Sequence, residues 1–322
     1  MIQPLREYLS KILPHRSAQD DVAAHYDDLD HCIQAMVRSF PAEGPPESYS
    51  CALWQDPYPP VQLPEVTIPT YFGMMNEIRR SQGPFVSTLT EANEIKIRAI
   101  ARRLHLEPGM RILDIGCGDG ALAYYLATKH GVKVEGITLS ERQLERAQSR
   151  AQKVGNIRFH LMDFADAPNL GTFDRVVSVG MMEHVGIGRL QEYAHVFRKV
   201  MAPNGRGLCH TIYKAVDAPE MNEWIALKIF PGTYVPNERD MADCFLSVGL
   251  QVEVFHHIPG IHYAKTLDAW RERLNEKWDS IKHHFADPEW QKRKMDFYLG
   301  GTAAWFRYGR QAAVAQLELV PA

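Results

Sequence analysis

The chain has 322 residues, of which 45% are hydrophobic and 23% are charged, a composition typical of a folded globular protein. It excludes a disordered, collagen-like or coiled-coil chain. The 36 Lys and Arg nearly balance the 39 Asp and Glu, so the charge favours neither nucleic-acid binding nor a polybasic membrane patch. Residues 1–16 lack the apolar core of a signal peptide, and no stretch reaches about 18 uncharged apolar residues, so we expect no transmembrane segment.

Cysteine and histidine usage argues against disulfides and metal sites. The number of cysteines is odd and none forms a C-x-x-C pair, which favours a reducing, cytoplasmic location; they are Cys32, Cys51, Cys117, Cys209 and Cys244. The later histidines lack the spacing of a ligand set, so we assign no metal; they are His256, His257, His262, His283 and His284.

The first 87 residues are expected to form a helical and Pro-rich cap segment. Residues 1–40 look helical, with Leu29, Ile33 and Met36 at helical spacing. Residues 41–87 are rich in proline and irregular, although 71–80 has the pattern of a short amphipathic helix.

Residues 88–322 are expected to form one α/β domain. Short apolar strands alternate with helices: helix 91–105, strand 111–115, helix 120–129, strand 132–137, helix 141–153, strands 157–161 and 175–179, helix 189–200 and strand 206–212. After residue 219 we expect two helical stretches, a strand at 251–255, helices at 266–285 and 289–309, and a last strand at 314–320. This alternation predicts a doubly wound, mostly parallel sheet, with a cap insertion around 213–245 over its carboxyl edge.

A glycine-rich turn joins the first strand of this domain to its helix. Residues 111–121 read RILDIGCGDGA, and Gly116, Gly118 and Gly120 allow a ligand to approach the backbone closely. The spacing is tighter than the dinucleotide motif G-x-G-x-x-G and resembles that of class I S-adenosylmethionine methyltransferases, which have a Rossmann-like, seven-stranded sheet. The resemblance implies S-adenosylmethionine as cofactor, with Asp114, Gly116 and Gly118 among its contacts.

Two further segments are candidates for the adenosine end of that cofactor. The second strand ends at Thr138-Leu139, where the superfamily usually has an acid for the ribose, so we expect Thr138, Leu139 and Gln143 to replace it. The same segment can also cap the next helix, a role that suits Ser140, and the two roles are compatible. After the third strand, Phe164 and Ala165 are expected at the adenine, although Phe164 also fits an ordinary core position.

Several motifs together resemble the cyclopropane fatty acid and mycolic acid synthase family. The resemblance runs from about residue 20 to the C-terminus and rests on HYD (25–27), YSCA (49–52), TLSERQ (138–143), VSVGMMEHVG (177–186), CHTI (209–212), IFPG (229–232) and HYAKTLDAW (262–270). It implies lipid biosynthesis in which an alkene takes the sulfonium methyl group and a bound bicarbonate ion removes a proton to close a cyclopropane. It further implies that Tyr49 and Ser50 contact the cofactor, that Cys51 and Ile212 hold bicarbonate through their backbones, and that Glu183, His210 and Tyr263 hold it through their side chains.

The residue chemistry agrees with these roles, but each residue also has an ordinary structural explanation. Glu183 can accept the bicarbonate hydroxyl proton, while His210 and Tyr263 can donate to its oxygens. Taken singly, Glu183 fits a solvated loop, Cys51 a small buried side chain, and His210 and Tyr263 core positions. His184 either carries a proton or points away. Aromatic side chains are candidates to stabilise a carbocation: Tyr234, Trp270, Tyr298, Trp305 and Phe306.

The chain also departs from the family pattern. Asp119 stands where the family usually has Trp, IFPGTYVP replaces IFPGG-x-LP, residues 58–87 look like an insertion, and 213–228 is short. We therefore expect an unsaturated substrate that is small or carrier-bound rather than a phospholipid or mycolate-length chain, and no separate N-terminal domain.

Three alternatives remain open at this stage. Methyl branching without ring closure would use the same first step. A small-molecule amine N-methyltransferase would need a general base but no bicarbonate site. A cofactor-binding protein without catalysis is the third alternative, and the sequence leaves homo-oligomer formation open.

Overall fold

The computed structural model describes residues 26, 29–37, 46–57, 75–80, 85–215, 218, 222–309 and 312–322, with the backbone alone for 75–80. Residues 1–25 of the expected helical segment 1–40 and most of the Pro-rich stretch lie outside the described residues. His25 and Asp27 of the HYD motif also lie outside them.

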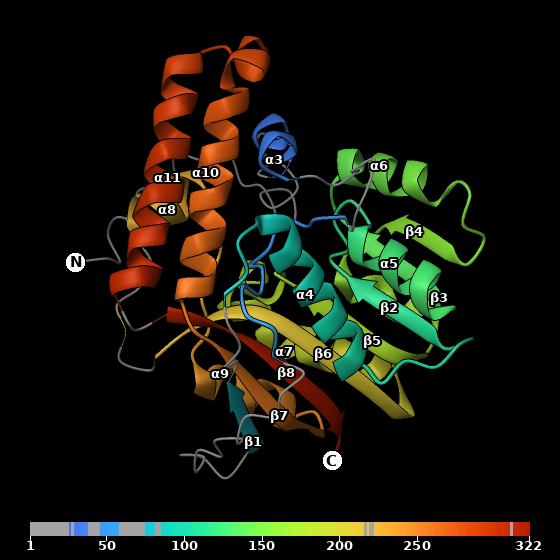
Figure 1. The fold of residues 1–322 in the computed structure, drawn as a ribbon. Coiled ribbons are helices and arrows are strands. Elements are labelled where there is room, and N and C mark those ends of the chain that lie inside the picture. Colours follow the sequence, from blue (N-terminus) through green and yellow to red (C-terminus); the bar gives the residue numbers. More distant parts are fainter. Residues whose placement is uncertain are drawn as a thin grey trace.

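An eight-stranded sheet forms the centre of the molecule (Figure 1). Its strands are β1 (Met75–Arg80), β2 (Arg111–Ile115), β3 (Lys133–Thr138), β4 (Ile157–Leu161), β5 (Phe173–Val179), β6 (Met201–Lys214), β7 (Leu250–Ile258) and β8 (Ala312–Pro321). They lie in the order β1-β7-β8-β6-β5-β2-β3-β4, and only β8 runs antiparallel to its neighbours β6 and β7. The predicted seven strands are confirmed as β2 to β8.

The helix predicted over residues 71–80 was wrong. Residues 75–80 form β1, which pairs in parallel with β7 at the edge of the sheet. An open sheet edge offers a row of backbone hydrogen-bond partners, and such distant pairing can override a local amphipathic pattern.

Helices cover both faces of the sheet. On one face, α4 (Leu89–Arg103), α5 (Ala121–His130) and α6 (Glu141–Ala151) enclose a buried cluster that includes Ile100, Leu126 and Phe159. On the other face, α7 (Leu190–Val200) and α9 (Glu238–Leu246) enclose a cluster that includes Phe197 and Phe245 (Figure 1). These two layers make the doubly wound arrangement that the alternating pattern predicts.

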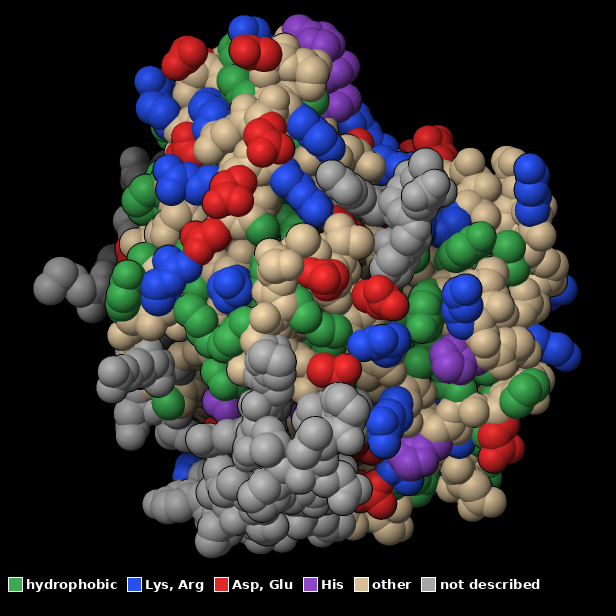
Figure 2. Space-filling view, viewed as in Figure 1, with side chains coloured by type: hydrophobic (Ala, Val, Ile, Leu, Met, Phe, Trp, Pro, Cys, Tyr) green, Lys and Arg blue, Asp and Glu red, His purple; other side chains and the backbone are tan. Residues whose placement is uncertain are grey.

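A third group of helices stands beside the carboxyl edge of the parallel strands. It comprises α3 (Asp30–Met36), α8 (Glu223–Lys228), α10 (Ile261–Ile281) and α11 (Pro288–Tyr308). Figure 1 shows α10 and α11 as a long antiparallel pair with α3 beside α10, and their shared apolar cluster includes Met36, Trp270 and Tyr298. On the face shown in Figure 2, acidic and basic side chains are interspersed over this pair, without a patch of one sign. None of the described helices is long and apolar enough to cross a membrane.

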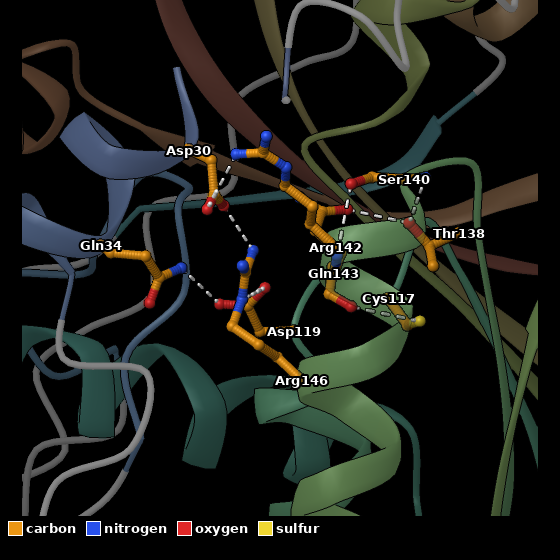
Figure 3. Close-up of polar contacts among 10 residues, drawn as sticks. Asp30, Gln34, Cys117, Asp119, Thr138, Ser140, Arg142, Gln143 and Arg146 are labelled. Carbon is orange, nitrogen blue, oxygen red and sulfur yellow. Dashed lines mark hydrogen bonds and ion pairs between the residues drawn. The ribbon is translucent and has the colours of Figure 1, made fainter. Parts of the chain in front are cut away.

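Ion pairs hold α3 against the glycine-rich turn (Figure 3). Arg146 of α6 lies 2.7 Å from Asp30 at the start of α3 and 3.0 Å from Asp119 in the turn. Gln34 of α3 also donates to the Asp119 carboxylate at 3.1 Å. The Asp30 and Asp119 side chains are only 11% and 10% exposed, so water screens these contacts less than it would on an open surface. Asp119, which departs from the expected Trp, therefore links the turn to α3.

We expect the substitution Arg146→Met to loosen α3, because it removes both ion pairs while keeping the apolar stem. Hydrogen exchange followed by mass spectrometry should find the α3 amides roughly five to ten times less protected, the effect of about 1 kcal/mol. Arg142→Met is the matched control, since Arg142 lies 3.8 Å from Asp30 and its side chain is half exposed. Equal protection of α3 in the two variants would contradict a role for Arg146.

Candidate functional site

The turn after β2 needs its glycines. Gly116, Gly118 and Gly120 have φ values of 78°, 53° and 73°, in the left-handed region that side chains other than glycine rarely adopt. A Cβ added at Gly116 would also lie 2.9 Å from Met181 Cγ, too close for any side chain without movement of Met181. The glycines therefore let the backbone turn directly at the end of β2, and without side chains they leave open space beside the turn.

That space is a pocket, here called the glycine-loop pocket, which runs along the carboxyl ends of β2, β3, β4 and β5. Nine of the ten residues predicted to contact the cofactor line it: Tyr49, Ser50, Asp114, Gly116, Gly118, Thr138, Leu139, Gln143 and Phe164. Ala165 lies outside the lining, and its backbone N–H donates to the Asp163 carboxylate at 2.9 Å.

Asp114 lines this pocket and carries an unsatisfied carboxylate oxygen. The side chain is 1% exposed, and its Oδ2 has no hydrogen-bond partner among the described residues. Burial raises the pKa of Asp114 to about 7, because desolvation disfavours the charged form. A buried acceptor without a partner is costly, so a ligand that brings an N–H or ammonium group would stabilise this site.

Thr138 and Gln143 lie together at the end of β3 (Figure 3). The Thr138 hydroxyl donates to Gln143 Oε1 at 2.8 Å. The Ser140 hydroxyl accepts from the Gln143 backbone N–H at 3.2 Å and so caps α6, as the capping alternative predicts. The two explanations coexist, because Ser140 forms the cap while Thr138 and Gln143 still line the pocket.

Phe164 belongs to both the pocket and the core. It begins the 3-10 helix Phe164–Leu170 (η1), lines the pocket and packs edge-on against Tyr193, with ring centroids 5.7 Å apart. The Arg189 guanidinium lies 4.3 Å from the Phe164 ring centroid and also pairs with Asp163 at 2.8 Å. These contacts fix the orientation of the ring at the pocket wall.

A second pocket, here called the inner pocket, adjoins the first. It brings together all five residues predicted to hold bicarbonate: Cys51, Glu183, His210, Ile212 and Tyr263. The two pockets share Tyr26, Tyr49, Ser50, Gly180 and His184 in their linings. The remaining wall of the inner pocket is mostly apolar and aromatic: Phe230, Thr233, Val235, Tyr298, Thr302, Trp305 and Phe306.

Glu183 is a buried acid at the end of β5. It lies in the 3-10 helix Met182–His184 (η2), is 5% exposed, and accepts a hydrogen bond from the Thr211 hydroxyl at 2.7 Å. Burial raises its pKa to about 7, although the hydrogen bonds from Thr211 and the Ile212 backbone oppose the shift. Glu183 can therefore change its protonation state near neutral pH.

The orientation of His210 is fixed by a neighbour that the sequence analysis missed. His210 of β6 lies directly opposite Gln316 of β8, whose Nε2 donates to His210 Nδ1 at 2.8 Å. Arg103 donates to Gln316 Oε1, and since Arg can only donate, the amide nitrogen must face the histidine. The ring is thereby held neutral with its proton on Nε2. Burial also favours the neutral ring, because it lowers the pKa of His210. The signal in the sequence was the polar Gln316 within the mostly apolar stretch AAVAQLELV.

Tyr263 and Cys51 remain protonated at neutral pH. Tyr263 lies near the start of α10 and packs against Phe306, with ring centroids 4.7 Å apart, and burial raises its pKa well above the usual value. Burial raises the pKa of the Cys51 thiol to about 12. The inner pocket thus holds the phenols of four tyrosines, the Cys51 thiol and the neutral imidazoles of His184 and His210. Among these lining residues, Glu183 is the one whose pKa burial shifts to about 7.

His184 faces both pockets rather than pointing away. Its Nε2 lies 3.3 Å from the Tyr26 hydroxyl, and its Nδ1 lies 3.4 Å from the Thr233 hydroxyl. Burial lowers its pKa to about 4, so it stays neutral. Of the five aromatic candidates, Tyr298, Trp305 and Phe306 line the inner pocket, whereas Tyr234 and Trp270 do not.

Within the described part of the chain, no group of three or more His, Cys, Asp or Glu side chains is placed to hold a metal ion. His256 lies 2.6 Å from Glu318, and His262 accepts from the Trp54 backbone N–H, so both have structural partners. His31 and His284 stack at the tip of the α10–α11 pair, with ring centroids 3.8 Å apart. All five cysteines are buried and free.

Comparison with known proteins agrees with this geometry. A family model described as mycolic acid cyclopropane synthetase matches residues 14–317. The chain is 32% identical over 283 residues to the cyclopropane-fatty-acyl-phospholipid synthase of Escherichia coli K12, which covers 88% of this chain and 63% of that protein. It therefore spans less than two thirds of that relative's length.

Two solved structures are similar over nearly the whole chain. The cyclopropane synthase MmaA2 from Mycobacterium tuberculosis superposes with a TM-score of 0.75 at 28% identity, covering 95% of this chain and 98% of that one. The mycolic acid cyclopropane synthase CmaA1, solved with SAH and CTAB, gives the same TM-score and coverage at 27% identity. Because the family model matches almost the entire length of this chain, the chain belongs to the mycolic acid cyclopropane synthetase family.

Proposed function

We propose that this protein transfers the methyl group of S-adenosylmethionine to an alkene carbon and closes a cyclopropane ring, with bound bicarbonate as the base. One observation carries the proposal: five residues from separate parts of the chain line one buried pocket that shares a wall with the glycine-loop pocket. Family membership supports the same reaction. The buried free cysteines are consistent with a reducing, cytoplasmic compartment.

The glycine-loop pocket fits S-adenosylmethionine. Asp114 offers an unsatisfied acceptor, Thr138 and Gln143 offer polar groups at the ribose position of this fold, and the glycines permit close approach. We propose that Tyr49, Ser50, Gly118, Leu139, Phe164 and Ala165 complete the site. When bound, the cofactor supplies a methyl group activated by a sulfonium centre. We propose that these residues would hold the cofactor with this methyl group toward the inner pocket.

Three of the side chains proposed to hold bicarbonate cannot themselves serve as the base. Transfer of a methyl group to an alkene leaves a carbocation on the substrate, and a proton must then leave the new methyl group. His210 Nδ1 already accepts a hydrogen bond, and its Nε2 carries the proton. Cys51 and Tyr263 are also protonated, so these three can donate hydrogen bonds but cannot remove a proton.

This donor set suits bicarbonate. We propose that the Cys51 and Ile212 backbones and the His210 and Tyr263 side chains donate hydrogen bonds to the ion, while ionised Glu183 accepts a hydrogen bond from its hydroxyl group. Hydrogen bonds to an anion strengthen where water is excluded. Held by these residues, bicarbonate would supply the base that removes the proton, and the electron pair of the broken C–H bond would close the ring.

The aromatic and apolar wall favours an unsaturated acyl chain as substrate. Phe230, Trp305 and Phe306 present apolar surface, and aromatic faces can stabilise the transient cation. The names of the relatives indicate phospholipid and mycolic acid substrates for those proteins. For this chain we propose a shorter or carrier-bound acyl group, because the segment after Tyr213 is short. Methyl branching and amine N-methylation are the alternatives that the assays below separate.

The first test is Glu183→Gln, which keeps the size of the side chain but removes its negative charge. We expect turnover to fall at least about a hundredfold, while S-adenosylmethionine binds with unchanged affinity in calorimetric titration. In the wild type, turnover should rise as the pH increases through about 7, because Glu183 must be ionised to accept a proton. Full activity in the variant would overturn the assignment of Glu183.

The second test removes dissolved carbonate from the assay by purging with inert gas. Cyclopropanation of an unsaturated acyl substrate should slow markedly and recover when bicarbonate is added back. Product NMR separates ring, branched methyl and N-methyl groups. Amine methylation needs no such ion, so a carbonate-independent rate with an N-methyl product would favour that alternative.

A further inference from the structure

A buried lysine faces the glycine-loop pocket. It lies outside all of the motifs on which the family resemblance rests. Lys96 lies on α4 and is 1% exposed. Its Nζ donates to the Ser48 hydroxyl at 2.7 Å and to the Ser50 hydroxyl at 2.9 Å, and the residue is part of the pocket lining. The ammonium group is therefore held in one place at the pocket wall.

The positive charge of Lys96 has no direct anionic partner in the described part of the chain. Both of its hydrogen-bond partners are neutral hydroxyls. The nearby acid Glu47 is engaged by the Arg273 guanidinium and by the Thr90 hydroxyl at 2.7 Å. Burial of an ammonium group is costly, and here desolvation lowers the pKa of Lys96 to about 8, although the nearby Cys51 and Glu47 oppose the shift. An anion bound in the pocket would relieve this cost.

The direction of the pocket indicates which anion this is. Thr138 and Phe164 lie at the ends of β3 and β4, where this fold places the nucleoside part of a ligand. The opposite end lies at β5, where Ser50 and Gly180 line both pockets. In a ligand that extends from the first end to the second, the part farthest from its nucleobase reaches Ser50, and hence Lys96. In S-adenosylmethionine this part is the amino acid group, and its carboxylate is the only negative group of the molecule.

We propose that Lys96 binds the carboxylate of S-adenosylmethionine and so positions the amino acid end of the cofactor, with Ser48 and Ser50 orienting the ammonium group. This inference rests on the proposed function. Asp114 suits the other charge of the same group, since its unsatisfied oxygen can accept from the α-ammonium. The pocket then carries a cation for the carboxylate and an acid for the α-ammonium of the same amino acid group.

The test compares the binding of S-adenosylmethionine and decarboxylated S-adenosylmethionine by calorimetric titration at neutral pH. We expect Lys96→Met to weaken binding of the first ligand by about thirtyfold or more, and that of the second by less than about threefold. Lys153→Met removes an exposed lysine of the same charge and should change neither affinity. Binding of the decarboxylated ligand also reports that the variant pocket is folded.

Each other outcome decides against the proposal. Equal losses for both ligands would make Lys96 a structural residue only. An unchanged preference for the carboxylate, with loss of the response to added bicarbonate, would assign the lysine to that ion instead. Either result leaves the methyltransferase assignment intact, whereas failure of the wild type to bind either ligand would overturn both. If Lys96→Met does not fold, Ser48→Ala should reduce the preference about threefold, and an unchanged preference would contradict the proposal.

Discussion

The burial of polar side chains at the carboxyl edge of β2, β5 and β6 is the constraint on which the site depends. Asp114, Glu183 and His210 are all nearly inaccessible, and burial shifts each pKa toward the neutral form. In such surroundings every polar atom needs a partner, and every hydrogen bond that forms is stronger than it would be in water. In the proposed reaction, the same burial would shield the transient cation on the substrate from capture by solvent.

The last strand has a chemical as well as a structural role. β8 inserts antiparallel between β6 and β7, and this register sets Gln316 opposite His210. Arg103 fixes the amide of Gln316, and the amide fixes the histidine, so a residue of α4 orients a ring in the inner pocket through β8. On the other side of the site, the contacts of Asp119 with Arg146 and Gln34 join the N-terminal helix α3 to the turn that forms the first pocket.

Local pattern was enough to predict most of the fold and, together with the family resemblance, most of the candidate site. Strands β2 to β8 and the helices between them follow from hydrophobic periodicity, which depends on neighbouring residues alone. The glycine turn was predictable because the left-handed backbone at Gly116 excludes other side chains. The residues of the inner pocket were expected from the family resemblance, which rests on short motifs such as YSCA and HYAKTL, and not from their local pattern alone.

Tertiary structure alone decided the partners of those residues. Residues 75–80 became a strand because β7 offered an open edge, not because of their own pattern. Gln316 meets His210 across 106 positions and Lys96 meets Ser50 across 46, and register and helix docking set both contacts. The sequence by itself thus determined which chemical groups the protein possesses and the elements that carry them. Only the packed structure determined which groups lose water and which charges face one another, because burial and pairing arise from contacts between distant segments.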